Sequence, residues 1–151
     1  MMTPEIRRAH ESDVEHIVRF NAAMAEETEG RTLDQETLTA GVMNGLQHPE
    51  YGFYLVAEVE EQVVGCLMVT TEWSDWRNGI FWWIQSVYVV LQFRRQGIFS
   101  ALYNAVKNLA DSREDICGLR LYVEHQNIPA RETYRSMGME DTGYLVYEEE
   151  F

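Results

Sequence analysis

The sequence predicts a mixed α/β fold in which helices cover a central sheet, and three observations support this. Two β-rich runs, 52–59 and 63–73, flank Glu60-Glu61-Gln62 and are typical of an antiparallel hairpin. The run IFWWIQSVYVV, residues 80–90, is too apolar for a surface strand and is expected near the middle of the sheet. Helix and strand patterns then alternate, as in a β-α-β unit. The expected order is β-α-α-β-β-β-α-β-α-β in a single domain, 1–151.

The first half of the chain is expected to contain a short strand, EIRRA at residues 5–9, and two helices. Ser12 and Glu15 have the spacing of a capping box, and Gly30 is a natural helix end. A second helix is expected over 33–47. The first helix carries one apolar stripe at helical spacing, made of Val14, Ile17, Val18 and Met24.

The second half is expected to alternate helix and strand. Residues 97–112 predict an amphipathic helix, 118–124 a strand, and 128–138 a short helix. The segment TGYLVYEEEF, residues 142–151, is expected to form a last strand. Its apolar part could pair in a homodimer, whereas its acidic end could equally protect a sheet edge.

Composition narrows the class of function. A net charge of −13 argues against nucleic-acid binding, which depends on neutralising phosphates with Lys and Arg. It favours a cationic small molecule as partner, or else only maintains solubility. No apolar run reaches the roughly 20 residues of a membrane span, and the N-terminus lacks the pattern of a secretory signal. Cys66 and Cys117 suggest small core residues of a reducing, cytoplasmic compartment, and no metal-ligand spacing occurs.

A basic loop lies where the apolar run 80–90 gives way to a helix. Free backbone N–H groups and the positive end of a helix dipole would meet there, as in phosphate-binding sites. The alternative is an ordinary connection. The candidate binding residues are Arg94, Arg95, Gln96, Gly97, Ile98, Phe99 and Ser100.

The spacing Arg94-x-x-Gly97-x-Phe99 resembles the pyrophosphate loop Q/R-x-x-G-x-G/A of the GNAT superfamily of N-acetyltransferases. Phe99 departs from the Gly or Ala of that pattern. A second segment resembles the family's N-x-x-A-x-x-x-Y-x-x-x-G pattern. Its matching residues are Asn127, Ala130, Tyr134 and Gly138. Two matches in the expected order of elements make the resemblance specific, and it covers nearly the whole chain.

The resemblance implies a sheet with a splayed parallel strand pair and helices on both faces. It also implies acetyl-CoA as donor, without a metal, and a primary amine that attacks directly in a ternary complex. A backbone N–H near Val87 would stabilise the oxyanion, while Val89 and Asn127 would bind the pantetheine chain. Tyr134 would give a proton to the departing thiolate, although a packed core aromatic is the alternative for that residue.

The general base is expected to be Glu72, with Glu124 and His125 as alternatives. Each of the three could instead be a solvated surface group. The acceptor is expected to be a small cationic amine, because carboxylates beside tryptophan suit an ammonium group. The candidate acceptor-binding residues are Glu26, Glu29, Trp73 and Gln85.

Two other functions remain open from the sequence. The chain could be a non-catalytic module that binds or senses acyl-CoA and has lost turnover. It could also be an unrelated α/β domain whose paired arginines occur by chance at the surface.

Overall fold

The computed structural model describes residues 3–151, which divide into two compact units. The first unit ends at Leu121, and the second comprises Tyr122–Phe151. The elements of the first unit are β1 (Glu5–Arg8), the 3-10 turn η1 (Glu11–Asp13), α1 (Val14–Glu29), α2 (Gln35–Gln47), β2 (Phe53–Val59), β3 (Gln62–Ser74), β4 (Gly79–Val89), the 3-10 turn η2 (Leu91–Phe93), α3 (Ile98–Asp111) and β5 (Ile116–Leu121).

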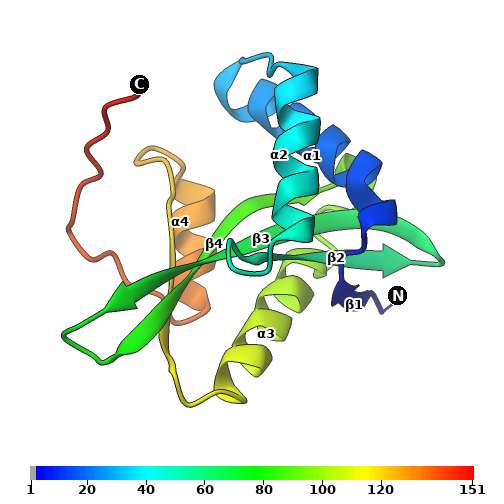
Figure 1. Ribbon diagram of the computed structural model, residues 1–151. Helices are drawn as coiled ribbons and strands as arrows, with labels where there is room; N and C mark the ends of the chain where they lie inside the picture. The colour runs from blue at the N-terminus through cyan, green and yellow to red at the C-terminus, as the bar shows by residue number, and fades with distance from the viewer. Residues whose placement is uncertain (1–2) are drawn as a thin grey trace. The chain divides into compact units, whose positions relative to one another are not determined.

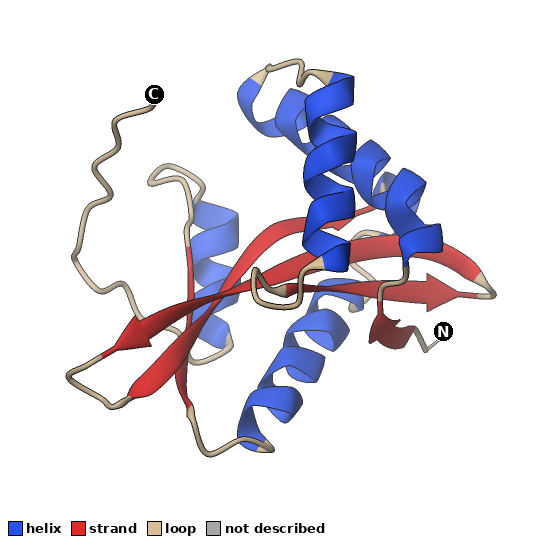
Figure 2. Cartoon of the chain, viewed as in Figure 1, coloured by secondary structure: helices blue, strands red, loops and turns tan. Residues whose placement is uncertain are grey.

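The first unit is a five-stranded sheet with helices on both faces. Its strands follow the order β1-β2-β3-β4-β5, and every neighbouring pair is antiparallel except β4 and β5. Helices α1 and α2 cover one face, and α3 covers the other (Figure 1). Figure 2 shows the same arrangement by secondary structure. The mixed α/β fold class that the sequence predicted is confirmed.

The core on the α1 and α2 side joins both helices to the middle of the sheet. Apolar side chains of α1 and α2 meet the inward residues of β2 and β3, because alternate strand residues point to the same face. On the opposite face, α3 buries a stripe of four residues. The largest fully buried side chains of the unit include Ile17, Leu55, Leu67 and Leu102.

The parallel pair β4 and β5 is splayed. Residues Ile80–Ile84 of β4 pair with β5, whose last paired residue is Leu121. Strand β4 then continues to Val89. In the described part of the first unit, residues 85–89 therefore have a strand partner only on the β3 side. The predicted splayed pair is confirmed.

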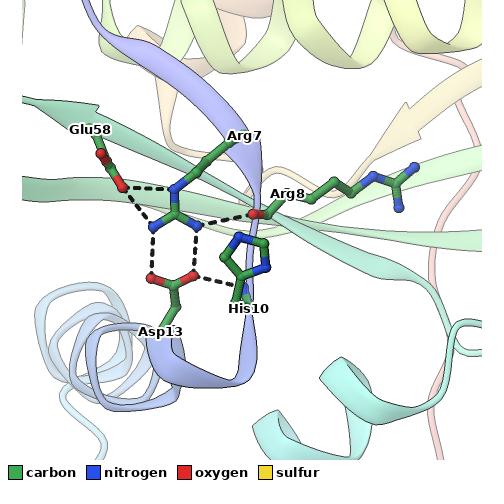
Figure 3. Close-up of polar contacts among 5 residues, drawn as sticks. All are labelled: Arg7, Arg8, His10, Asp13 and Glu58. Carbon is green, nitrogen blue, oxygen red and sulfur yellow. Dashed lines mark hydrogen bonds and ion pairs between the residues drawn. The ribbon is translucent and has the colours of Figure 1, made fainter. Parts of the chain in front are cut away.

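A charged network joins β1, η1 and β2 (Figure 3). Arg7 donates from Nη1 to Oδ2 of Asp13 at 2.8 Å, from Nη2 to Oδ1 of Asp13 at 3.0 Å, and from Nε to Oε1 of Glu58 at 2.7 Å. The carboxylate of Asp13, in a residue that is 4% exposed, also accepts from the backbone N–H of His10 at 2.7 Å. The predicted capping box of Ser12 and Glu15 is therefore wrong, because the box forms two residues earlier, between His10 and Asp13.

The second unit contains one helix, α4 (Ile128–Ser136), among its described elements. The predicted last strand over 142–151 is wrong, since residues 139–151 have no regular secondary structure. Gly143 donates its backbone N–H to Oδ1 of Asp141, so a turn forms where the strand was expected to begin. Beyond it, Tyr144 and Tyr147 are exposed and have no strand partner in the described chain. Without a partner strand, an apolar run cannot form the backbone hydrogen bonds of a sheet.

Candidate functional site

Strand β4 carries a bulge in its splayed part. Cys66 of β3 pairs with Tyr88, but Met68 pairs with Gln85, so β4 contains one extra residue between these pairs. Ser86 lies at this point with a φ of 52°, in the left-handed region. A bulge interrupts the regular ladder and re-aims the backbone groups of the bulged strand. The N–H expected to face an oxyanion, near Val87, lies in this interrupted stretch.

The loop between η2 and α3 has an unusual backbone. Arg95 and Gly97 both have positive φ, 63° and 83°. A left-handed residue next to a right-handed one, as at Gly97 and the first helical residue Ile98, turns successive N–H groups toward a common point, which is the geometry of an anion-binding nest. A Cβ added to Gly97 would meet no heavy atom within 4 Å, so the space beside this backbone is open.

The start of α3 lacks an internal cap. Its first turn contains no acidic residue, and no side chain caps it. By contrast, α2 begins at Asp34, whose carboxylate accepts from the backbone N–H of Thr37. The first backbone N–H groups of any helix have no acceptor within that helix. The start of α3 therefore suits an external anion.

The two arginines of the loop differ in their surroundings. Arg94 donates from Nε to the carbonyl of Val89 at 2.8 Å and from Nη2 to Glu27 of α1 at 2.8 Å. Arg95 is exposed and has no ion-pair partner among residues 3–151. The Arg94 guanidinium is therefore paired within the protein, whereas the charge of Arg95 is available to pair with a bound anion.

The remaining loop residues divide between packing and solvent. Ile98 is buried, and Phe99 is half-buried with its ring 6.1 Å from that of Tyr103. Gln96 donates its side-chain amide to the carbonyl of Gln92, and Ser100 is exposed. Phe99 therefore packs along α3, and a large side chain is accommodated where the family pattern has Gly or Ala.

Glu72 lies near the end of β3, on the same face of the sheet as Cys66 and Met68, which pack against α1 and α2. Its Oε1 accepts from Nη1 of Arg120 at 2.6 Å and from Nε1 of Trp83 at 3.2 Å. The Arg120 guanidinium in turn stacks 3.7 Å from the ring centroid of Phe81. Within the described chain Oε2 of Glu72 accepts no hydrogen bond, so this oxygen can receive a proton or an ammonium.

The predicted acceptor residues do not all share one face. Register places Gln85 on the same face as Glu72, and Gln85 donates to Thr70 at 2.5 Å. Trp73 is 61% exposed and, as the next residue after Glu72, points to the opposite face. Glu26 and Glu29 are exposed at the end of α1, in the same unit.

In the second unit, Asn127 caps α4 by accepting from the backbone N–H of Ala130 at 3.2 Å. Its side-chain NH2 has no partner in residues 3–151 and remains a donor. Burial raises the pKa of Tyr134. Glu124 accepts from the backbone N–H of Gln126.

The match with a family model decides the family. The model of the Acetyltransferase (GNAT) family matches residues 14–139. The chain belongs to this family. No curated protein matches the chain significantly.

Solved structures with the same fold include proteins described as acetyltransferases. A possible acetyltransferase from Clostridium difficile 630 is 48% identical, with a TM-score of 0.92 over 100% of this chain and 99% of that one. A predicted acetyltransferase from Clostridium acetobutylicum, solved with acetyl-CoA, is 19% identical, with a TM-score of 0.79 over 97% and 96%. AAC(6')-Iy, solved with the bisubstrate analogue CoA-S-monomethyl-acetylneamine, is 14% identical, with a TM-score of 0.79 over 99% of each chain.

Two residues in contact with the candidate residues or their neighbours, Tyr88 and Arg120, belong to neither of the two motifs found in the sequence. Tyr88 donates its hydroxyl to Oε1 of Glu27 at 3.1 Å, and Arg120 holds Glu72. Strand alternation offers a signal for Arg120, because a charged residue between Leu119 and Leu121 must face a polar partner or solvent.

Two further findings concern the part of the chain that the structure describes. Among residues 3–151, no helix is long and apolar enough to cross a membrane. Within the same range, no group of three or more His, Cys, Asp or Glu side chains could hold a metal ion.

Proposed function

We propose that this protein transfers an acetyl group from acetyl-CoA to a primary amine, which attacks directly in a ternary complex, and that residues 1–151 act as one N-acetyltransferase domain in the cytoplasm. The observation that carries the proposal is the β4–α3 loop. It combines two left-handed residues, an uncapped helix start and open space at Gly97. Backbone N–H groups in such a loop bind phosphate oxygens without a metal.

The donor is held by the loop and by β4. The backbone N–H groups of residues 95–100 bind the pyrophosphate, with Arg95 adding positive charge. Val89 and the Asn127 side chain bind the pantetheine amides. The N–H near Val87, re-aimed by the bulge at Ser86, donates to the acetyl oxygen as negative charge develops on it.

Two proton transfers complete the reaction. An alkylammonium has a pKa of about 10.4, so less than about 0.1% of the amine is neutral at pH 7 and a base is needed. Glu72 takes this proton on Oε2, the oxygen that Arg120 and Trp83 leave open. Tyr134 gives a proton to the thiolate, since a phenol with a pKa of about 10 is protonated at neutral pH.

The acceptor is a small cationic amine bound near Glu26, Glu29 and Gln85; Trp73 is left out of this site, because it points to the opposite face of the sheet. The net charge of −13 attracts a cation. The neamine-derived analogue bound to AAC(6')-Iy indicates that this fold can accommodate a small amine.

Calorimetry with CoA and thiol release from acetyl-CoA test the proposal. We expect CoA binding, and turnover with spermidine or putrescine rather than with lysine peptides. CoA binding without thiol release on any amine would instead support an acyl-CoA-sensing module. Absence of CoA binding would refute both functions.

Replacing Tyr134 with Phe tests its role as the acid. Because a thiol has a pKa of about 8.5 and leaves readily, we expect kcat to fall only about ten- to a hundredfold, with unchanged CoA affinity. An unchanged kcat would remove Tyr134 from the mechanism.

A further inference from the structure

A cluster of three side chains joins α1 to the end of β4 and the start of the donor loop. Glu27 lies in the last turn of α1, Tyr88 follows the β4 bulge, and Arg94 begins the loop. We propose that Glu27 is a positioning residue for the donor site: through Arg94 and Tyr88 it fixes the backbone that binds acetyl-CoA. This inference rests on the proposed function, because it assumes that the β4–α3 loop binds the donor.

Both oxygens of the Glu27 carboxylate are used. Oε2 accepts from Nη2 of Arg94 at 2.8 Å, and Oε1 accepts from the Tyr88 hydroxyl at 3.1 Å. Arg94 also donates from Nε to the carbonyl of Val89 at 2.8 Å, and its guanidinium lies 5.2 Å from the centroid of the Tyr88 ring. One carboxylate thus connects a helix, a strand end and a loop.

The segments that Glu27 joins are those whose backbone is irregular. Tyr88 comes two residues after Ser86, which has a left-handed φ at the bulge, and Arg94 immediately precedes Arg95, which has another. Positions with strained dihedrals persist only when the surrounding structure holds them. The Tyr88 ring also stacks on Phe20 of α1, with centroids 5.4 Å apart, so α1 supports this strand end by both packing and charge.

Charge makes the arrangement specific to Glu27. Residues Glu26, Glu27 and Glu29 form an acidic turn in a chain of net charge −13, yet only Glu27 has an ion-pair partner among the described members of this turn. An unpaired carboxylate beside a pyrophosphate site would repel the ligand. Pairing with Arg94, which lowers the pKa of Glu27, offsets this repulsion and uses the charge to hold the loop.

The rival interpretation predicts the opposite sign. If Arg94 served mainly as a cation for the pyrophosphate, Glu27 would compete for it, and removing the carboxylate would tighten CoA binding. If Arg94 instead holds the loop in place, the geometry of its guanidinium matters more than its charge. Lysine keeps the charge but cannot form the hydrogen bonds to both Val89 and Glu27.

Calorimetric titration with CoA at fixed ionic strength distinguishes the two. We expect Glu27→Gln to weaken CoA binding about three- to tenfold, since hydrogen bonds to a charged group are lost from a partly exposed site. Arg94→Lys should weaken binding as much as Arg94→Gln, within about twofold. The matched control is Glu15→Gln, which removes the same charge from an exposed position of the same helix and should change affinity by less than about 1.5-fold.

A double-mutant cycle shows whether Glu27 acts through Arg94. In an Arg94→Gln background, Glu27→Gln should have less than about a 1.5-fold effect. Glu27→Asp should restore part of the affinity, and it also serves as the test variant should Glu27→Gln fail to fold. With the most active amine, Glu27→Gln should raise KM for acetyl-CoA and leave kcat unchanged.

Unchanged or tighter CoA binding by Glu27→Gln, or full retention of affinity by Arg94→Lys, would overturn the inference while leaving the proposed function intact. Failure of the wild-type protein to bind CoA would instead overturn the proposed function.

Discussion

Two corners of the molecule each contain a pair of adjacent arginines near a strand end, but the arginines have different partners. Arg7-Arg8 forms the end of β1, shortly before the first helix, and Arg94-Arg95 stands between β4 and α3. At the first corner the chain supplies its own anion, because Asp13 binds both Arg7 and a backbone N–H. At the second corner the first turn of the helix contains no acid. At the first corner this anion caps the start of the helical segment, whereas the start of α3 has no side-chain cap and is open to a ligand.

Burial separates the carboxylates of the two corners. The side chain of Asp13 is 5% exposed, whereas that of Glu27, which pairs with Arg94, is 43% exposed. Solvent screens an exposed ion pair and leaves it little net effect on folding, while a buried charge that loses its partner is costly. Removing a charge of the first network should therefore lower the free energy of unfolding. Removing a charge of the second should instead weaken ligand binding.

The largest expected effect is that of Asp13→Ala. It leaves Arg7 with only Glu58 as a carboxylate partner and removes the acceptor of the His10 N–H, so we expect the free energy of unfolding to fall by about 3 kcal/mol. Glu27→Ala should lower it by less than about 1 kcal/mol, because that pair is largely solvated. Urea unfolding monitored by tryptophan fluorescence measures both, and equal losses would contradict the contrast between the corners.

Acid should weaken the first corner in a predictable direction. Hydrogen bonding to Arg7 lowers the pKa of Asp13 below its ordinary value of 3.8. A group whose pKa is lowered on folding stabilises the protein above its unfolded pKa, and this contribution is lost as pH falls through the folded pKa. Urea titrations from pH 5 downward should therefore show a decline below about pH 3.8 that is smaller in Asp13→Asn. Parallel declines would exclude Asp13 as the cause.

Glycines with left-handed φ allow a matched test of the second corner. Gly97 and Gly30 have φ values of 83° and 61°, and a Cβ at either would meet nothing within 4 Å. Alanine at either position should lower the free energy of unfolding by about 1 kcal/mol, for the same steric reason. Only Gly97→Ala should also weaken CoA binding, about tenfold or more, because its Cβ enters the proposed phosphate space. Equal CoA affinity in the two variants would remove the loop from the donor site.

The comparison also shows what could be predicted from sequence. The strands of the sheet and the loop at Gly97 follow from local patterns, namely apolar runs and a glycine between strand and helix, whereas the splayed pair was implied by the family resemblance. The partners of Arg94 and Glu72 do not, because Glu27 and Arg120 are 67 and 48 residues away along the chain. The last strand was expected from the residues of 142–151, but a strand also needs a partner, which composition cannot supply.

The smallest expected effect concerns Ser86, whose left-handed φ of 52° marks the bulge. Glycine there would relieve a steric cost of about 1 kcal/mol but would lose a similar amount to chain entropy in the unfolded state. Because the Ser86 hydroxyl has no hydrogen-bond partner among residues 3–151, we expect Ser86→Gly to change the free energy of unfolding by less than about 0.5 kcal/mol. Ser86→Val should cost more, since a β-branched side chain tolerates positive φ poorly. If the two variants had equal free energies of unfolding, the left-handed backbone at Ser86 would not be strained. The contacts of α1 with Tyr88 would then not be needed to hold a strained bulge.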